Sequence, residues 1–236
     1  MARSDESFVG IDGCRDGWIA VHWSSAGLAA STLTSVLAAR WEDFDLEEVA
    51  AVGVDMPIGL SDRGPRACDT AARALLPAGR KSSVFPPPKR YMLGLSWAEA
   101  NTAGKAREGK GLSRQAGNIS AKIRELDSAI SAPMQQRIYE IHPELVFHHL
   151  NDGGALTPKR YTAGRMERLR LLQEAGLPEL EGLFELYPRK QVKPDDLLDA
   201  AACALAAKCI ARGEARRLPE NEPPRDSRGL RMEIWY

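Results

Sequence analysis

Residues 8–12 read FVGID and residues 51–55 read AVGVD, and the expected topology of the chain follows from these two stretches. Each is a short apolar run that ends in an aspartate, which is typical of a buried strand with a carboxylate at its end. A third aspartate, Asp199, opens the alanine-rich run at residues 200–207. A buried carboxylate is costly unless it is paired, hydrogen-bonded or bound to a metal ion. We therefore ask whether Asp12, Asp55 and Asp199 meet in space.

The segment between the first two aspartates predicts how their strands are arranged. Strands at residues 18–23 and 28–36 follow the first after short turns, so these three strands are expected to be antiparallel neighbours. Residues 41–49 carry apolar side chains at helical spacing. Because a helix precedes it, the fourth strand at residues 50–55 can run parallel to the first. Asp12 and Asp55 are then expected at the same edge of the sheet.

The rest of the chain completes an α/β fold, with a mixed five-stranded sheet and flanking helices. We expect a single domain over residues 1–236, with a mostly helical basic insertion at 60–136 between strands four and five. The fifth strand is predicted at 138–142 and a closing strand at 230–236. Helices are predicted at 66–76, 97–108, 113–130, 144–150, 165–175, 178–187 and 194–212.

Composition limits the class of protein. Hydrophobic residues make up 44% of the 236 residues, which is enough for a large core, and no apolar run approaches the roughly 20 residues of a membrane span. The first seven residues contain acids where a signal peptide needs a basic and an apolar region. The four cysteines show no metal-binding spacing, so we expect reduced thiols. A cytoplasmic protein with no membrane partner is predicted.

Charge is distributed unevenly along the chain. The formal net charge is zero, yet residues 61–124 hold 13 Lys and Arg against 4 Asp and Glu. Such a segment is typical of a basic face for nucleic acid or another phosphate ester, although an ordinary solvated surface has the same composition. The candidate substrate-binding residues are Arg15, Arg66, Arg80, Lys81, Ser82, Ser83, Lys110, Ser113, Gln115 and Lys122.

The acids permit two interpretations. Asp196 and Asp199 are three residues apart and share one face at the start of a helix. Each acid has an ordinary explanation: Asp196 as a helix cap, Asp12 and Asp55 as turn residues. If they converge instead, the carboxylates suit Mg²⁺ or Mn²⁺, and three or four of them can hold two such ions roughly 4 Å apart. Glu140, on the fifth strand, is a candidate fifth acid.

The order of these elements resembles the ribonuclease H-like superfamily, particularly its Holliday-junction resolvase branch. Nearly the full length of the chain is similar to an uncharacterised prokaryotic family of predicted ribonuclease H-like nucleases. The matching stretches are VGIDGCR (9–15), DMPIGL (55–60), SSVFPPP (82–88), KGLSRQ (110–115), YEIHPE (139–144), DLLDA (196–200) and GLRMEIWY (229–236).

This resemblance implies a metal-dependent nuclease. Asp12, Asp55 and Asp199 would be the catalytic metal ligands, with Asp196 or Glu140 assisting. Two alternatives stay open at this stage. One is an ATP-dependent phosphotransferase related to sugar kinases and actin-like ATPases, which share a first-strand aspartate and a glycine-containing phosphate turn. The other is a non-enzymatic module that binds phosphate or nucleic acid. The closing strand can pair with the core sheet or with a second copy in a homodimer.

Overall fold

A five-stranded mixed sheet forms the centre of the molecule. The computed structural model describes residues 6–33, 49–177 and 180–236. The strand order is β3-β2-β1-β4-β5; β1 is antiparallel to β2 and parallel to β4, and β4 is parallel to β5. This arrangement confirms the predicted α/β class and is consistent with a ribonuclease H-like fold. The strands are β1 (Ser7–Cys14), β2 (Gly17–Ser24), β3 (Gly27–Leu33), β4 (Val49–Val54) and β5 (Ile138–Glu140).

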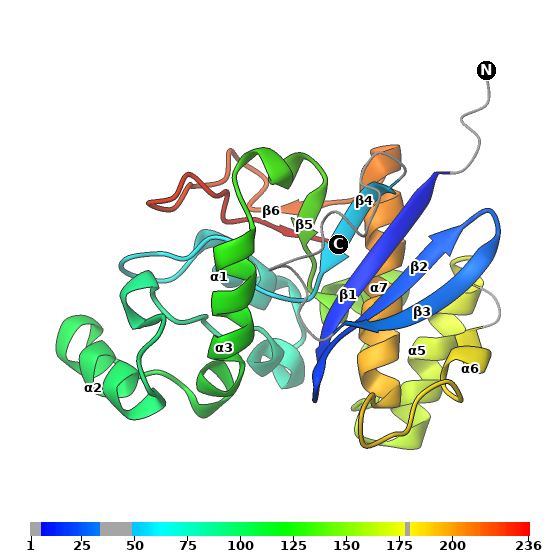
Figure 1. Cartoon of the computed structure of the whole chain (residues 1–236), viewed down its shortest axis with the longest axis horizontal. Coiled ribbons are helices and arrows are strands. Elements are labelled where there is room, and N and C mark those ends of the chain that lie inside the picture. The colour runs from blue at the N-terminus through cyan, green and yellow to red at the C-terminus, as the bar shows by residue number, and fades with distance from the viewer. Residues whose placement is uncertain (1–5, 34–48, 178–179) are drawn as a thin grey trace.

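Helices cover both faces of the sheet (Figure 1). On one face lies the alanine-rich helix α7 (Pro194–Arg212), which packs against β1 and β4 and against α4 (Pro143–Leu150) and α5 (Thr162–Glu174). The short helix α6 (Leu180–Leu183) contacts β3. Successive side chains of a strand point to opposite faces of the sheet, so every second side chain of β1 points to the face opposite α7.

The second face is covered by the insertion between β4 and β5. Ile123 and Leu126 of helix α3 pack in one buried cluster with Val9 and Ile11 of β1. As predicted, the insertion is mostly helical, and its helix α2 projects away from the sheet (Figure 1). Its elements are α1 (Ala67–Leu75), η1 (Ala78–Ser83), η2 (Arg90–Met92), α2 (Trp97–Glu108), α3 (Arg114–Ala129) and η3 (Pro133–Gln136).

Several predicted elements are shorter in the structure or lie outside the described residues. The fifth strand, predicted at 138–142, ends at Glu140, and the helix predicted at 178–187 spans Leu180–Leu183. The predicted helix at 41–49 falls almost entirely outside the described residues, and Val49 already belongs to β4. The closing strand is shorter than predicted: only β7 (Ile234–Trp235) is a strand, paired with β6 (Arg217–Leu218) of the same chain. Trp235 also forms a bridge to Ile141, which joins this small sheet to the edge of the main one.

Among the helices that the structure describes, none is long and apolar enough to cross a membrane.

Candidate metal centre

Asp12 and Asp55 lie side by side at the carboxyl ends of neighbouring parallel strands. Gly10 of β1 is in register with Gly53 of β4, and the two aspartates follow these glycines by two residues. Because side chains alternate along a strand, both aspartates point to the same face as the glycines. The Asp55 amide N–H donates to the carbonyl oxygen of Ile11 at 2.8 Å, which extends the pairing of the strands to the aspartates.

Two glycines allow α7 to deliver the third aspartate. A Cβ on Gly10 would lie 1.9 Å from the carbonyl oxygen of Ala200, and one on Gly53 would lie 2.5 Å from that of Cys203. The helix backbone therefore rests directly on the strand backbones, which is possible only without a side chain at these two strand positions. This close approach places Asp199 beside the strand ends.

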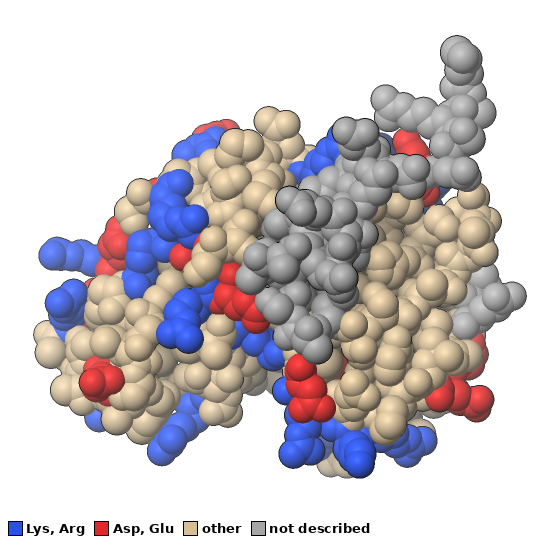
Figure 2. Space-filling model, viewed as in Figure 1, with Lys and Arg blue, Asp and Glu red and all other residues tan. Residues whose placement is uncertain are grey.

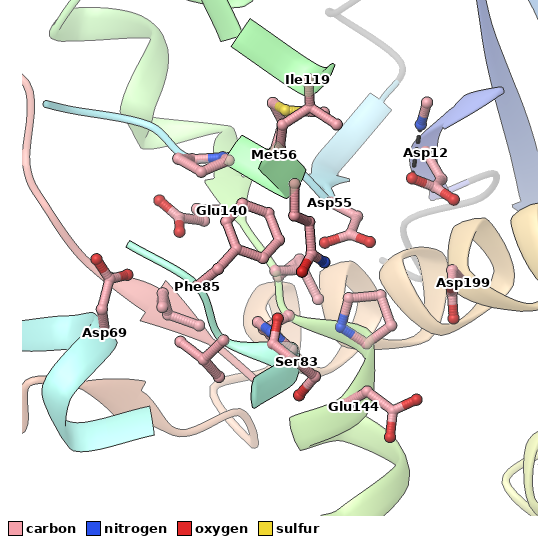
Figure 3. Close-up of a pocket in the computed structure, with 18 of the residues that line it drawn as sticks. Asp12, Asp55, Met56, Asp69, Ser83, Phe85, Ile119, Glu140, Glu144 and Asp199 are labelled. Atoms are coloured by element: carbon pink, nitrogen blue, oxygen red, sulfur yellow. Dashed lines mark hydrogen bonds between the residues drawn. The ribbon is translucent and has the colours of Figure 1, made fainter. Parts of the chain in front are cut away.

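The three aspartates form one compact cluster (Figure 3). One carboxylate oxygen from each of Asp12, Asp55 and Asp199 can be chosen so that all three lie within 4.8 Å of one another. Asp199 is 3% exposed and Asp12 is 9% exposed. The amide N–H of Gly13 donates to Asp12 Oδ1 at 2.6 Å, whereas Asp199 Oδ1 is buried with no hydrogen-bond partner among the described residues. The cluster thus contains an oxygen that lacks a donor.

Burial and mutual repulsion disturb the ionisation of these acids. Burial, followed by the charge of Asp199, raises the pKa of Asp55 to about 8. The same two causes, burial first and then the neighbouring carboxylates, raise the pKa of Asp12 well above its ordinary value. Burial also raises the pKa of Asp199, against the opposing charge of Lys159. Without a further cation, the cluster therefore resists carrying its full negative charge.

Lys159 is a member of the cluster that the sequence analysis missed. Its Nζ donates a hydrogen bond to Asp199 Oδ2. Burial works against the charge on this lysine, but Asp199, Asp12 and Asp55 outweigh it and raise the pKa of the ammonium group. Lys159 comes from the loop before α5, and nothing in its local sequence distinguishes it from other surface lysines.

Glu140 lies in the same pocket but belongs to a separate ionic cluster. Arg66 donates from Nη2 to Glu140 Oε1 at 2.6 Å and from Nη1 to Oε2 at 2.8 Å. Arg66 also binds both carboxylate oxygens of Asp69, at 2.6 and 3.0 Å. The backbone N–H of Ile58 donates to Glu140 Oε2 at 2.7 Å. Glu140 and Arg66, expected from sequence in the catalytic and substrate-binding groups, thus fasten the turn after Asp55.

A pocket of about 300 Å³ opens over the cluster. The sheet and α7 form one side of it, and the insertion forms the other. The described lining includes all three aspartates, Lys159, and half of the predicted substrate-binding residues: Arg66, Arg80, Ser83, Gln115 and Lys122. The other half does not line it: Arg15, Lys81, Ser82, Lys110 and Ser113 are exposed. The insertion therefore supplies one wall of the pocket.

Several of these side chains already have structural partners. Arg80 Nη2 donates to the carbonyl oxygen of Leu156 at 2.8 Å. Lys122 Nζ donates to the carbonyl oxygen of Gly17 and lies 5.0 Å from the ring centre of Trp18. The Ser113 hydroxyl accepts the N–H of Ala116 at 3.1 Å and caps α3. Arg80 and Lys122 also line the pocket, so they can contact a ligand in addition to these partners.

Asp196 caps the start of α7, as the first of its two interpretations predicted. Its Oδ2 accepts the backbone N–H of Lys193 at 2.9 Å, at the first turn of α7. It is not among the residues that line the pocket. Its charge nevertheless contributes to raising the pKa of Asp12, after burial and the charges of Asp55 and Asp199.

The donor set fits a divalent cation that prefers oxygen. Every candidate ligand of the aspartate cluster is a carboxylate, which is the ligand type that hard cations select. Asp199 Oδ1 lacks a hydrogen-bond donor among the described residues, and burial raises the pKa of all three acids, which opposes their negative charge. A bound divalent cation would bind the Asp199 oxygen that has no donor and would balance negative charge on the three carboxylates.

A comparison with known protein families finds a match over most of the chain. The family model described as "Protein of unknown function (DUF429)" matches residues 10–224, which include all three aspartates. No curated protein matches the chain, and no solved structure matches it. The chain belongs to the DUF429 family.

Proposed function

We propose that this DUF429 protein is a divalent-metal-dependent phosphodiesterase that cleaves nucleic acid, with Asp12, Asp55 and Asp199 holding Mg²⁺ or Mn²⁺. The observation that carries the proposal is the convergence of three carboxylates within 4.8 Å at the floor of a pocket. A structural role alone explains one buried acid at a strand end. It does not explain why segments about 40 and 140 residues apart bring three acids together with Lys159 hydrogen-bonded to one of them.

The ion and the protein have different tasks in this proposal. A divalent ion supplies Lewis-acid stabilisation of the charge that develops on a phosphoryl group during hydrolysis. The chain holds and orients the ligands: the Gly13 N–H fixes one oxygen of Asp12, and the close packing of α7 on β1 and β4 fixes Asp199. The Glu140–Arg66 pair keeps the turn after Asp55 in place. Precise orientation of this kind accounts for much of the rate in phosphoryl chemistry.

The insertion supports a phosphate-bearing substrate. Within the pocket it contributes Arg80, Ser83, Gln115 and Lys122 as cationic and hydrogen-bonding groups. Arginine, lysine, serine and glutamine side chains are common donors to the phosphates and sugars of nucleic acids. These four residues are therefore proposed to contact the phosphate nearest to the metal ion.

The outer surface of the insertion favours a polymer over a small phosphate ester. Figure 2 shows Lys and Arg side chains spread over the part of the molecule that holds α2 and α3. Arg114 stacks 3.6 Å from the ring centre of Trp97, and Arg107 lies 4.4 Å from that of Tyr91. Cations alongside aromatic rings suit a single strand, whose phosphates and bases they contact together. Lys110 and Ser113 belong to this outer surface.

The phosphotransferase alternative has less support. It requires a phosphate-binding loop after the first strand, but β1 and β2 remain paired up to Cys14 and Gly17. Only Arg15 and Asp16 lie between them, so this turn is a tight hairpin. Such a turn does not offer the open glycine-rich backbone that wraps a phosphate chain. The non-enzymatic alternative is decided by the assay below.

The test is cleavage of labelled single- and double-stranded DNA and RNA in Mg²⁺ or Mn²⁺. Asp12→Asn preserves the shape of the side chain but removes a charged ligand, and we expect the rate to fall by about 10³-fold or more, since a metal ion contributes several kcal/mol. Asp16→Asn, in the exposed hairpin turn, is the matched control and is expected to keep wild-type activity. Equal cleavage by Asp12→Asn and wild type would reject the site, and no metal-dependent cleavage of any substrate would favour the binding module.

A further inference from the structure

Lys159 contacts the aspartate cluster from a partly exposed position in the pocket lining. Its side chain is 39% exposed, whereas that of its partner Asp199 is 4% exposed. Lys159 lines the pocket, and its Nζ is hydrogen-bonded to Asp199 Oδ2. A cationic side chain therefore both contacts the carboxylate cluster and lines the pocket above it.

The loop that carries Lys159 is held by a buried arginine. Arg168 of α5 is 0% exposed, and its Nη1 donates to the carbonyl oxygens of Thr157 and Gly164 at 2.9 and 2.8 Å. Its Nη2 donates to both carboxylate oxygens of Glu144, at 2.8 and 3.0 Å. A fully buried guanidinium is rare unless it is paired and hydrogen-bonded in this way. This arrangement fixes the backbone two residues before the lysine.

Further contacts hold the same loop on its other sides. Glu167 accepts hydrogen bonds from the amide and the hydroxyl group of Thr157, at 2.8 and 2.6 Å. Arg165 Nη1 donates to the carbonyl oxygen of Lys159 itself at 3.2 Å. Arg80 from the insertion binds the carbonyl oxygen of Leu156. Three side chains of α5 and one from the insertion therefore hold the backbone on either side of Lys159, which a surface lysine that met an acid by chance would not need.

The charges of the cluster lead to a specific stoichiometry. Three ionised carboxylates carry three negative charges, and the ammonium group of Lys159 cancels one of them. The remaining two charges are balanced by a single divalent cation. A second divalent ion would in addition compete with Lys159 for Asp199 Oδ2, the oxygen that the lysine binds. Both considerations favour one ion and one lysine over two ions.

We propose that Lys159 takes the place of a second metal ion, so that the site binds one divalent cation and uses the lysine ammonium group as its other positive charge. This inference rests on the proposed metal-dependent function and specifies how its site is built. In sites with two ions, the second ion stabilises charge on one side of the phosphoryl group. Here the tethered ammonium group of Lys159, which lines the pocket, would stabilise that charge.

The experiment counts Mn²⁺ ions per chain by isothermal titration calorimetry, together with electron paramagnetic resonance to detect coupled Mn²⁺ pairs. Wild type is expected to bind about one ion with no pair signal, and Lys159→Met about two ions with a pair signal, since the lost charge and the freed oxygen admit a second ion. Lys159→Arg keeps the charge and is expected to stay at one ion. Lys122→Met removes a pocket lysine outside the cluster and is expected to stay at one ion.

Two ions in the wild type, or one ion in both wild type and Lys159→Met, would overturn the inference. If cleavage still depends on Asp12 in that case, the nuclease proposal stands and only the role of Lys159 is rejected. No Mn²⁺ uptake by the wild type overturns both proposals. Circular dichroism and thermal melting check that each variant is folded, and Lys159→Gln, a neutral side chain of similar reach, replaces Lys159→Met if the latter does not fold.

Discussion

Two groups of buried acids share one pocket, and they differ in how completely their oxygens are satisfied. In the first group, the carboxylates of Glu140 and Asp69 are both bound by the guanidinium of Arg66, and Glu140 also accepts a backbone N–H. In the second group, Lys159 donates a hydrogen bond to Asp199, whereas Asp12 and Asp55 interact with its charge without an ion pair to it, and Asp199 Oδ1 has no donor among the described residues.

This difference separates a structural cluster from a candidate active site. Buried charges that are paired and hydrogen-bonded hold segments together, and removing one partner is costly because the other stays buried. Buried charges that lack partners cost free energy in the isolated chain and persist where a ligand compensates them. Substitutions in the two groups are therefore expected to have opposite effects on the stability of the metal-free protein.

Arg66→Met is expected to change the free energy of unfolding more than any other substitution in this comparison. It leaves Glu140 and Asp69 buried without their shared cation, and we expect the free energy of unfolding to fall by about 3–5 kcal/mol. Chemical denaturation measures this change. Arg63→Met, at an exposed position of the same loop, is expected to change stability by less than about 0.5 kcal/mol. A similarly small loss for Arg66→Met would remove the distinction between the two clusters.

Gly53→Ala tests how the second cluster is assembled. The added Cβ would meet the carbonyl oxygen of Cys203 at 2.5 Å and Ile141 Cγ1 at 2.8 Å, so α7 must move away from β4. We expect a loss of about 1–3 kcal/mol in stability, typical of overpacking, and a weaker affinity for Mn²⁺ because Asp199 moves with the helix. Gly182→Ala, where a Cβ meets no atom within 4 Å, is the control. Unchanged Mn²⁺ affinity in Gly53→Ala would mean that the helix position does not set the site.

Asp55→Asn is expected to stabilise the metal-free protein, in contrast to Arg66→Met. Burial and the charge of Asp199 raise the pKa of Asp55 to about 8, while a carboxyl in an unfolded chain titrates near about 3.9. Between these values the folded chain binds a proton that the unfolded chain has released. The stability of the wild type therefore falls as the pH rises through this window, and an asparagine removes that loss.

The measurement is thermal melting in EDTA at pH 5 and pH 8. At pH 8 we expect Asp55→Asn to melt at least about 2–4 °C above the wild type, the shift that each 1 kcal/mol produces in a chain of this size, and at pH 5 the difference should shrink. Adding Mn²⁺ should reverse the order, since only the wild type keeps all three ligands and gains stability from binding. A pH-independent difference between the two proteins would contradict the role assigned to Asp55.

Local patterns were sufficient to predict part of the site. Apolar runs that end in Asp12 and Asp55, with a crossover between them, predicted parallel strands with both acids at one edge, and the structure has this arrangement. The start of the last helix was marked by Pro194 and the acids that follow it. The glycines at positions 10 and 53 and the alanine run beginning at 200 were also visible, and together they were the available signal for close helix packing.

Pairings between distant segments were not predictable from these patterns. Arg66 was counted with the substrate-binding basic residues, yet its partner Glu140 lies 74 positions away and draws it into the interior. Asp196 shares a helix turn with Asp199 but caps the helix instead of lining the pocket. Lys159 is one of 32 Lys and Arg residues, and only the folded loop shows that it meets Asp199.

The strands, the late helix and the edge of the sheet at which the acids gather were predictable from the amino-acid sequence, because hydrophobic periodicity and chain connectivity act over short distances. Which acids have a paired cation and which do not depends on the folded chain. That outcome depends on distances of a few ångströms between side chains from segments far apart in the chain, and on their removal from water, which sets the strength of each charge interaction.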